Sequence, residues 1–436
     1  MTKAKIGALC LARGTFDFEA ARALYLERKA QIERDGSVEW FFYGDLVFEP
    51  EQAQQAAEYF EKAGVDAVMA VSGTFHLGHL ALIVEKRLRR PLLLWGFNEL
   101  PYNGGKIRLN SVCGVNLDAS NLYKAGNDTY VCHIGDEPDP DWIRAVKMKA
   151  VLAGAHFGLA GYRAHGFFNL GAADADLYGK TGVLLDHYEL SDLMRGAGEA
   201  GAGYGAGEVA EIFDCAAITP EQLEKVAALT RSMESFLLRN RLDALAVRCW
   251  PEFADTYGIS PCAAMSLLAA KGYTLGCEGD VEGTLSMLAC NAVADEPAFL
   301  ADLSQVNLRE DYALMWHCGV AACPLWDKKS ARTLEPYFAG GRGVTADFVM
   351  KSGPVTFMRI DSARGVTRLF IQSGTAMEMD KDLKGTYCKV RFGKPAAQVL
   401  DTVTSRGVAH HVAMIYGDYA ETMRKFARIM DFETIE

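Results

Sequence analysis

Within the first hundred residues, short apolar runs alternate with longer amphipathic segments. The apolar runs at 6–12, 39–48, 67–73 and 91–97 predict buried strands, and the segments at 17–34, 49–64 and 77–90 carry helical periodicity. Strands that alternate with helices in this way are joined by crossover connections, which make neighbouring strands parallel. The N-terminal region is therefore predicted to be a doubly wound α/β domain.

The alternation resumes after an acidic, proline-punctuated segment at 135–142, with predicted helices up to 155 and over 219–239 and apolar runs at 157–168, 182–194 and 242–250. Beyond about residue 295 the pattern changes to short strands separated by turns, closed by an amphipathic helix after Asp418. We predict two doubly wound parallel-sheet domains, at 1–140 and 141–294, followed by a β-rich C-terminal domain at 295–436.

Charge and hydropathy restrict the partners. The chain has 436 residues, enough for about three domains, and a formal net charge of −11, which disfavours nucleic acid and anionic membranes. The short apolar run in the opening residues does not predict a signal peptide, and no run of 18 uncharged apolar residues predicts a membrane span. A cytoplasmic location and a small-molecule ligand are expected.

The eleven cysteines include no CxxC pair, and most lie inside apolar runs. A disulfide framework or a zinc ribbon is therefore not expected. We expect reduced cysteines that act as small apolar side chains. Cys277 stands apart because it precedes a cluster of acidic residues.

Three polar clusters could carry chemistry. Glu278 and Asp280 follow an apolar run and precede a predicted helix, Asp302 lies in a strand-like segment, and His410 and His411 lie at the turn into another strand. Two carboxylates and one imidazole form an open set of ligands that suits Mn²⁺ or Mg²⁺ better than structural zinc. The alternatives are a helix N-cap for the acidic residues and purely structural roles for Asp302 and the histidines.

A glycine-rich stretch at 196–208 contains a formal GxGxxG at Gly196, Gly198 and Gly201. A dinucleotide site needs these glycines directly after a strand, whereas here they follow a helical pattern. A flexible loop is the favoured interpretation.

An ordered set of segments resembles L-fucose isomerase and the wider fucose/arabinose isomerase superfamily. These segments are LWGFN, CEGDVEGTLSMLA, FLADLSQVN, EPYFAGG with GPVTFMRID, and RGVAHHVAM. The resemblance spans nearly the whole chain, although the chain is shorter than typical fucose isomerases. It implies a fucose isomerase-like fold and a metal-dependent aldose–ketose isomerase.

The resemblance also implies roles for individual residues. Glu278, Asp302 and His410 match the family's metal ligands, and the metal is expected to be Mn²⁺, with Mg²⁺ or Co²⁺ as alternatives. Aldose–ketose isomerisation moves a proton between C1 and C2 through a cis-enediol, so it requires a base, an acid and stabilisation of oxyanion charge. Glu278 and Asp302 are the predicted catalytic residues, with their acid and base roles left open.

Substrate-contacting residues are expected at strand ends around the same cleft, with structural hydrogen bonding as the alternative for each. They are Arg13, which matches a substrate-contacting arginine of the family, and His76, Arg163, His165, Asn169, Arg248 and His317. The family's tryptophan-containing specificity segment has no match here, and SGTFHLGH, with His76 and His79, stands near its place. Together with the arginines, this polar segment favours a hexose with a modified C6 end, either sulfoquinovose-like or a 6-deoxy sugar such as L-fucose.

The resemblance further implies a homo-oligomer in which first-domain residues of one subunit complete the active site of another. Two other functions stay open from the sequence. One is a non-catalytic sugar-binding sensor that kept the fold, and the other is an NAD-linked dehydrogenase using the glycine-rich stretch.

Overall fold

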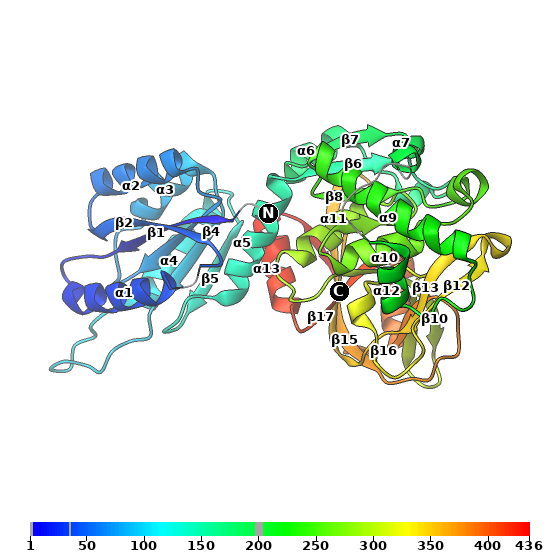
Figure 1. Ribbon diagram of the computed structural model, residues 1–436. Helices are drawn as coiled ribbons and strands as arrows, with labels where there is room; N and C mark the ends of the chain where they lie inside the picture. The colour runs from blue at the N-terminus through cyan, green and yellow to red at the C-terminus, as the bar shows by residue number, and fades with distance from the viewer. Residues whose placement is uncertain (1–2, 35, 197–203) are drawn as a thin grey trace. The chain divides into compact units, whose positions relative to one another are not determined.

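The computed structural model describes residues 3–34, 36–196 and 204–436, which form two compact units (Figure 1). Unit 1 comprises Met1–Val151 and Glu421–Phe432, and unit 2 comprises Leu152–Ala420 and Glu433–Glu436. In the described ranges, no helix combines the length and apolar character needed to cross a membrane.

Unit 1 contains a parallel sheet with strand order β2-β1-β3-β4-β5, which confirms the predicted doubly wound topology. Its strands are β1 (Lys5–Leu11), β2 (Glu39–Val47), β3 (Ala67–Ser72), β4 (Leu92–Gly96) and β5 (Tyr130–Ile134). Its helices are α1 (Phe18–Ile32), α2 (Pro50–Ala63), α3 (His79–Leu88), α4 (Ser111–Lys124), α5 (Pro140–Ala153, of which residues to Val151 belong to this unit) and α13 (Ala420–Met430, of which residues from Glu421 belong here).

Helix α2 shows why these segments fold as predicted. It begins with Pro50 in its first turn and ends at Gly64, whose φ of 67° lies in the left-handed region that terminates helices. Its buried face carries Phe60, and a Cβ on Gly7 of β1 would lie 2.8 Å from the Phe60 ring. The close packing of helix on sheet therefore requires a glycine at position 7. Figure 1 shows α2 and α3 side by side.

The strand order reverses between β1 and β3, and in such sheets ligands bind beyond the carboxyl ends of these strands. Arg13 follows β1, and its backbone N–H donates to Thr74 Oγ1 after β3 at 2.9 Å. The two segments that carry the predicted first-domain contacts thus lie next to each other.

Helix α13 belongs almost entirely to unit 1 although it lies near the C-terminus. Thr422 Oγ1 donates to Asp141 Oδ1 at 2.6 Å, and Lys425 Nζ lies 2.6 Å from Asp139 Oδ2, so α13 is held beside the start of α5. The sequence assigned α13 to a continuous C-terminal domain. The boundaries after residues 140 and 294 stay predictions.

Unit 2 contains a second parallel sheet with strand order β7-β6-β8-β9, which confirms a second doubly wound layer. The strands are β6 (His156–Ala160), β7 (Leu184–Tyr188), β8 (Ala244–Val247) and β9 (Thr274–Gly276). The helices are α6 (Asp174–Thr181), α7 (Leu190–Arg195), α8 (Ala206–Ile212), α9 (Pro220–Asn240), α10 (Cys262–Ala270), α11 (Val281–Asn291) and α12 (Ala396–Arg406).

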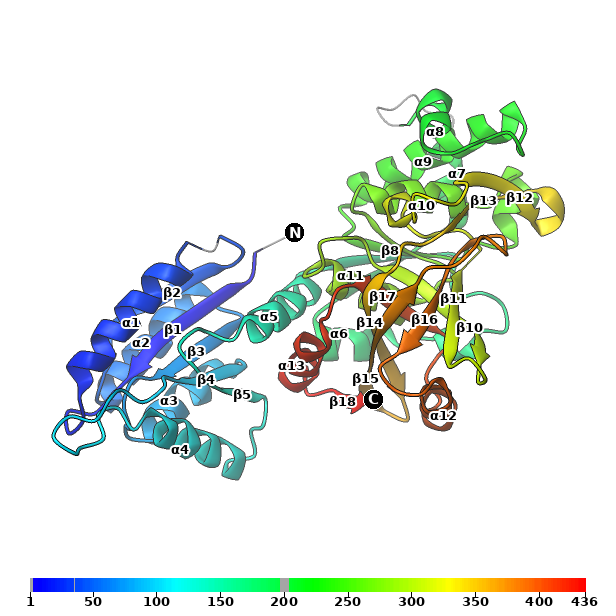
Figure 2. The same cartoon turned by 90° about the horizontal axis from the view of Figure 1, so that it is seen from below.

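The rest of unit 2 is the predicted β-rich region, and it closes into an antiparallel barrel (Figure 2). The pairings run β16-β11-β10-β17-β14-β15 and return to β16. The strands are β10 (Phe299–Asn307), β11 (Tyr312–His317), β12 (Thr333–Phe338), β13 (Gly343–Val349), β14 (Gly353–Ala363), β15 (Val366–Met377), β16 (Thr386–Phe392), β17 (His411–Tyr416) and β18 (Glu433–Ile435).

Helix α11 packs against both the parallel sheet and the barrel, since it contacts β8 and β9 as well as β14 and β17. Its residues are buried on every side from Val281 to Cys290. A Cβ on Gly276 of β9 would lie 1.8 Å from Thr284 Oγ1 of this helix, so the helix and the strand can meet only because position 276 is a glycine. The start of α11 is thereby held between the sheet and the barrel.

Candidate active site

Glu278 lies in the short turn between β9 and α11, at the carboxyl edge of the parallel sheet, where the sequence placed it. Its backbone φ is 62°, a left-handed conformation that costs energy for a residue with a side chain. Gly279 follows with a φ of 69°, and a Cβ there would lie 2.3 Å from the carbonyl oxygen of Tyr162. The tight packing of this turn fixes the direction of the Glu278 carboxylate.

The barrel supplies the other groups. Asp302 of β10 and His411 of β17 are direct partners in an antiparallel pairing, and His317 ends the neighbouring strand β11. The His317 and His411 rings stack with centroids 5.3 Å apart. The closed barrel thus brings together side chains that are separated by about a hundred residues in the sequence.

Glu278, Asp302 and His411 converge. His411 Nε2 lies 3.3 Å from Glu278 Oε2 and 3.4 Å from Asp302 Oδ1. In the part of the chain that the structure describes, His411 Nε2 and Asp302 Oδ1 are both buried without a hydrogen-bond partner. Buried polar atoms are almost always satisfied, so two unsatisfied ones that face each other indicate a missing ligand.

The donor atoms suit a divalent cation. Two groups could hold one, namely Glu278 with His410 and His411, and Asp302 with His317 and His411. Ligands bonded to a six-coordinate cation at about 2.1 Å stand about 3 Å apart, near the separations seen here. Carboxylate and imidazole donors suit a divalent cation, so the residues present fit a bound metal ion.

The partners of the ring nitrogens distinguish the three histidines. His411 Nδ1 lies 2.9 Å from Asp280 Oδ2, an acceptor, so Nδ1 carries the proton and Nε2 offers its lone pair. The backbone N–H of Cys318 instead donates to His317 Nδ1 at 2.9 Å, and the Asn169 amide lies 3.1 Å from His410 Nδ1. A donor at Nδ1 leaves the proton of a neutral ring on Nε2, which suits a hydrogen-bond donor better than a metal ligand.

Burial and neighbouring charges shift the pKa values of several groups in this cluster. Burial lowers the pKa of His317, but the neighbouring Cys318 and the carboxylates of Asp302 and Glu278 raise it to about 10, which disfavours a free lone pair at Nε2. Burial raises the pKa of Glu278, but the neighbouring imidazoles of His410, His411 and His317 outweigh burial and hold that pKa well below its usual range. Glu278 is therefore ionised at neutral pH, as a metal ligand must be.

His410, the predicted third ligand, also lies at this carboxylate. Its Nε2 is 3.8 Å from Glu278 Oε2, and its side chain is 39% exposed where that of His411 is fully buried. Phe167 packs edge-on against the His410 ring at 5.3 Å. His410 thus lies at the exposed side of the group, and His411 lies at its buried side.

Trp250 is a residue of the site that sequence reasoning missed. Its indole Nε1–H donates to Glu278 Oε1 at 2.9 Å, and its ring lies 5.9 Å from that of Phe167. The hydrogen bond occupies one oxygen of Glu278 and directs the other toward the histidines. The available signal was its position just after β8, at the same carboxyl edge as Glu278.

The loop after β6 carries three of the predicted substrate contacts. Asn169 reaches His410, as described above, and His165 is exposed. Arg163 lies between the rings of Tyr162 and Phe168, with its guanidinium 4.7 and 5.5 Å from their centroids. Within the described residues, Arg163 makes no ion pair with a carboxylate.

The other predicted contacts have different surroundings. Arg248 forms an ion pair with Glu252 at 2.7 Å. In unit 1, Arg13 is exposed, whereas His76 is fully buried and its ring nitrogens lie 2.9 Å from Asp118 Oδ2 and from the Thr74 carbonyl oxygen. Both ring nitrogens of His76 are thus engaged by groups of unit 1 in this structure.

The glycine-rich stretch does not follow a strand. Gly196 directly follows helix α7, while Gly198 and Gly201 lie outside the described residues. The strand that a dinucleotide fingerprint requires before its first glycine is therefore missing from the described chain at this point. All eleven cysteines are free thiols, as predicted.

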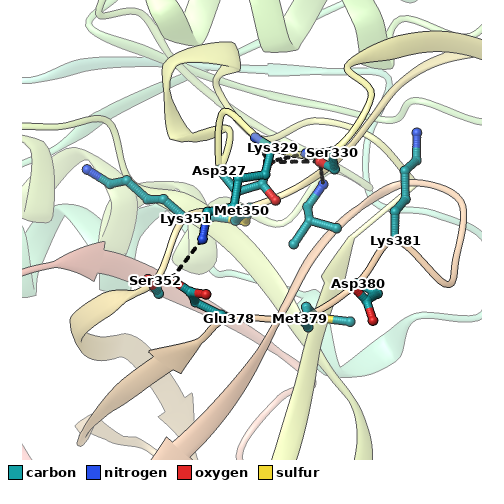
Figure 3. Close-up of a pocket in the computed structure, with 11 residues that line it drawn as sticks. Asp327, Lys329, Ser330, Met350, Lys351, Ser352, Glu378, Met379, Asp380 and Lys381 are labelled. Carbon is teal, nitrogen blue, oxygen red and sulfur yellow. Dashed lines mark hydrogen bonds and ion pairs between the residues drawn. The ribbon is translucent and has the colours of Figure 1, made fainter.

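A separate hollow of about 440 Å³ lies on the barrel (Figure 3). Its lysines are neutralised by carboxylates, because Lys329 pairs with Glu378 at 2.9 Å and Lys381 with Asp347 at 3.0 Å. Figure 3 shows Asp327 turned toward Lys329 and Ser330, which it holds in a local turn. None of the residues lining this hollow belongs to the group around Glu278.

Comparisons with known proteins agree with this geometry. Residues 7–137 match the family described as fucose/sulfoquinovose isomerase, N-terminal domain, and residues 317–436 match L-fucose isomerase, C-terminal domain. The chain is 27% identical over 445 residues to a sulfoquinovose isomerase of Priestia aryabhattai, covering 97% of both chains. Sulfoquinovose isomerases of Alkalicoccus urumqiensis and Clostridium sp. are 26% and 27% identical over 85% and 83% of this chain, and over 86% and 83% of their own.

The family matches place the chain in a class of aldose–ketose isomerases, and its carboxylates and imidazoles could hold a cation. The chain belongs to the fucose/sulfoquinovose isomerase family. This membership rules out the dehydrogenase considered from the sequence.

We expect Mn²⁺ to raise the thermal unfolding temperature of the wild-type protein, because an ion that binds only the folded state stabilises it by about 2.7 kcal/mol at a hundred times its Kd. His411→Gln should lose most of this shift. His156→Gln should keep it, because His156 forms a comparable pair with Asp186 at 2.7 Å elsewhere in unit 2. An unfolding temperature that Mn²⁺ leaves unchanged in the wild-type protein would contradict a metal site.

Proposed function

We propose that this chain catalyses metal-dependent isomerisation of an aldose to a ketose through a cis-enediol, with the cation held by Glu278, Asp302 and His411. The observation that carries the proposal is the pair of unsatisfied buried atoms, His411 Nε2 and Asp302 Oδ1, which face the ionised Glu278. His411 takes the ligand position that the resemblance gave to His410, because its lone pair faces the carboxylates.

The surrounding residues supply the rest of the chemistry. A divalent cation bound there would act as a Lewis acid on the C1 and C2 oxygens of the sugar. Glu278 and Asp302 take up and return the proton that moves between C1 and C2, and either can serve as base while the other serves as acid. Trp250 holds one oxygen of Glu278, so a single oxygen of this residue is free to act.

His317 and His410 complete the polar lining. Each presents a protonated Nε2 toward the group, which suits donation to a sugar oxygen that gains negative charge during enolisation. Phe167 and Trp250 add aromatic surface beside His410, and sugar rings pack well on such surface. Asn169 and His165, on the same loop as Phe167, are proposed to contact hydroxyl groups.

We propose a sulfonated hexose, sulfoquinovose, as the substrate, with a 6-deoxy sugar such as L-fucose as the alternative. The groups that act at C1 and C2 do not distinguish among aldoses, so the choice depends on residues farther along the sugar. Arg163 makes no ion pair with a carboxylate of the described chain and lies in the loop whose residue Ala164 donates its backbone N–H to the Glu278 carbonyl oxygen at 2.8 Å. The relatives named sulfoquinovose isomerase support the same choice.

The proposed assembly is a homo-oligomer in which the first domain of one subunit completes the active site of another. Arg13 and His79 are exposed in unit 1 and are available for such a role, whereas His76 is buried. A non-catalytic sugar sensor is the second candidate function, and turnover that depends on metal separates the two.

We expect chelation to abolish aldose–ketose exchange, followed by NMR of the C1 and C2 protons, and Mn²⁺ to restore it. Glu278→Gln should lower turnover by about 10²-fold or more, because an amide neither moves the proton nor supplies negative charge to the cation. Glu234→Gln is the matched control, since both glutamates are 14% exposed and Glu234 forms an ion pair with Lys271. Full turnover in metal-free protein would sink the proposal.

A substrate panel tests the sugar. We expect kcat/KM for sulfoquinovose to exceed that for L-fucose, L-arabinose, glucose and glucose 6-phosphate. Arg163→Ala should lower kcat/KM for sulfoquinovose by about 10- to 100-fold, the size of a lost charge-assisted hydrogen bond, and should affect neutral sugars less. Arg248→Ala should have a smaller effect because Glu252 already neutralises Arg248. Preference for a neutral sugar, unchanged in both variants, would eliminate the anionic substrate.

Light scattering at working concentrations should show an oligomer. Arg13→Ala should lower turnover and leave the oligomer intact, because Arg13 is expected to contact the substrate and not to hold the subunits together. A fully active monomer would contradict the shared active site.

A further inference from the structure

A buried carboxylate lies directly behind His411. We propose that Asp280, held by Arg359, is a positioning residue that fixes the orientation and the proton of the His411 ring, so that Nε2 offers its lone pair to the cation. This inference rests on the proposed metal site and adds to it two residues, Asp280 and Arg359, that do not touch the cation.

The contacts are specific. Asp280 Oδ2 lies 2.9 Å from His411 Nδ1, and Arg359 binds both oxygens of Asp280, through Nη1 at 2.7 Å and Nη2 at 3.1 Å. Arg359 Nη1 also donates to the main-chain carbonyl oxygen of His411 at 3.0 Å. Arg359 therefore holds His411 twice, once through the backbone and once through Asp280.

All three side chains are completely buried. A buried carboxylate needs a matching cation, and a planar guanidinium that binds both of its oxygens also fixes the plane of the carboxylate. Because water does not reach the pair, the ring of His411 cannot turn without leaving Nδ1–H and a charged oxygen unsatisfied. The arrangement therefore restricts His411 to one orientation and one tautomer.

A simpler role for Asp280 is the N-cap of helix α11, since Oδ1 accepts the backbone N–H of Gly283 at 2.9 Å. Capping uses Oδ1, however, and the contact with His411 uses Oδ2. A neutral cap would satisfy the helix without a buried arginine. A neutral cap does not supply the charged acceptor that keeps the proton of His411 on Nδ1. Acceptors that bind the second ring nitrogen in this way commonly orient metal-binding histidines.

The neighbouring histidines show where the proton of a neutral imidazole lies when a hydrogen-bond donor, rather than an acceptor, faces Nδ1. At His317 and His410 a donor faces Nδ1, and both rings lack a carboxylate at that nitrogen among the described residues. The charge of Asp280 thus selects His411 from a cluster of three imidazoles.

The test is Asp280→Asn, which keeps the shape and the cap but can present an amide N–H to His411. Binding of Mn²⁺ alone is followed through the EPR signal of the free ion. We expect the Kd for Mn²⁺ to rise about 10- to 100-fold, the usual cost of losing such a partner. Turnover lost at low Mn²⁺ should be recovered in part by raising Mn²⁺, which a general loss of folding would not allow.

Thr219→Ala is the matched control. Thr219 caps helix α9 of the same unit by accepting the backbone N–H of Gln222 at 3.2 Å, so its removal costs a cap without touching the site. Its Mn²⁺ affinity should equal that of the wild-type protein. Equal affinity of the wild-type protein and Asp280→Asn would overturn the inference, whereas wild-type protein that binds no Mn²⁺ would overturn the metal site itself.

A second variant and a measurement on the wild-type protein keep the inference testable if Asp280→Asn does not fold. Arg359→Lys keeps the charge but loses the two-pronged contact, and its Kd should lie between those of the wild-type protein and Asp280→Asn. In wild-type protein loaded with diamagnetic Mg²⁺, nitrogen NMR should show the His411 proton on Nδ1. A proton on Nε2 would refute the assignment.

Discussion

The contact of Arg359 and His411 with the buried Asp280 is the interaction on which the candidate active site depends. It joins β14, β17 and the first residue before α11, so it ties the barrel to the helix that packs on the parallel sheet. Each charge is costly when isolated in the interior, and together they satisfy one another. Because Asp280 meets both Arg359 and His411 only in one geometry, the barrel and the start of α11 meet in a defined register. The unsatisfied atoms of His411 and Asp302 then face the turn that carries Glu278.

The backbone of the turn that carries Glu278 is conformationally strained. Glu278 adopts a left-handed backbone conformation, and Gly279 packs on the Tyr162 backbone so closely that a side chain would not fit. Strain of about 1–3 kcal/mol persists only where the surrounding structure imposes it, and here α11, the loop after β6 and Trp250 do so. The result is a carboxylate with one oxygen occupied and one directed toward the imidazoles. The parallel sheet holds Glu278 and the barrel holds Asp302 and His411. Both parts therefore contribute to the rigidity of the site.

In the proposed function, reaction and specificity are supplied by different parts of unit 2. Glu278, Asp302 and His411 are fixed by buried contacts of strands and a helix, whereas Arg163, Phe167 and Asn169 lie on the loop after β6. Chemistry at C1 and C2 is common to all aldoses and suits a rigid framework. Discrimination at the far end of a sugar suits a loop, whose residues vary without disturbing the core.

The sequence by itself determined the fold class, because the alternation of buried runs with amphipathic segments leaves few ways to bury apolar surface. It also placed Glu278 at a strand end and singled out Asp302 and the histidine pair. The residues by themselves left the histidine pair open, and the resemblance pointed to His410. Which ring faces Asp302 depends on the register of β17 against β10, in which Asp302 pairs with His411. The sequence could not pair Asp280 with Arg359 or place Trp250 at Glu278, because these partners are 79 and 28 residues apart in sequence. Only the tertiary structure decided which nitrogen carries a proton, because that depends on a partner brought in by the barrel.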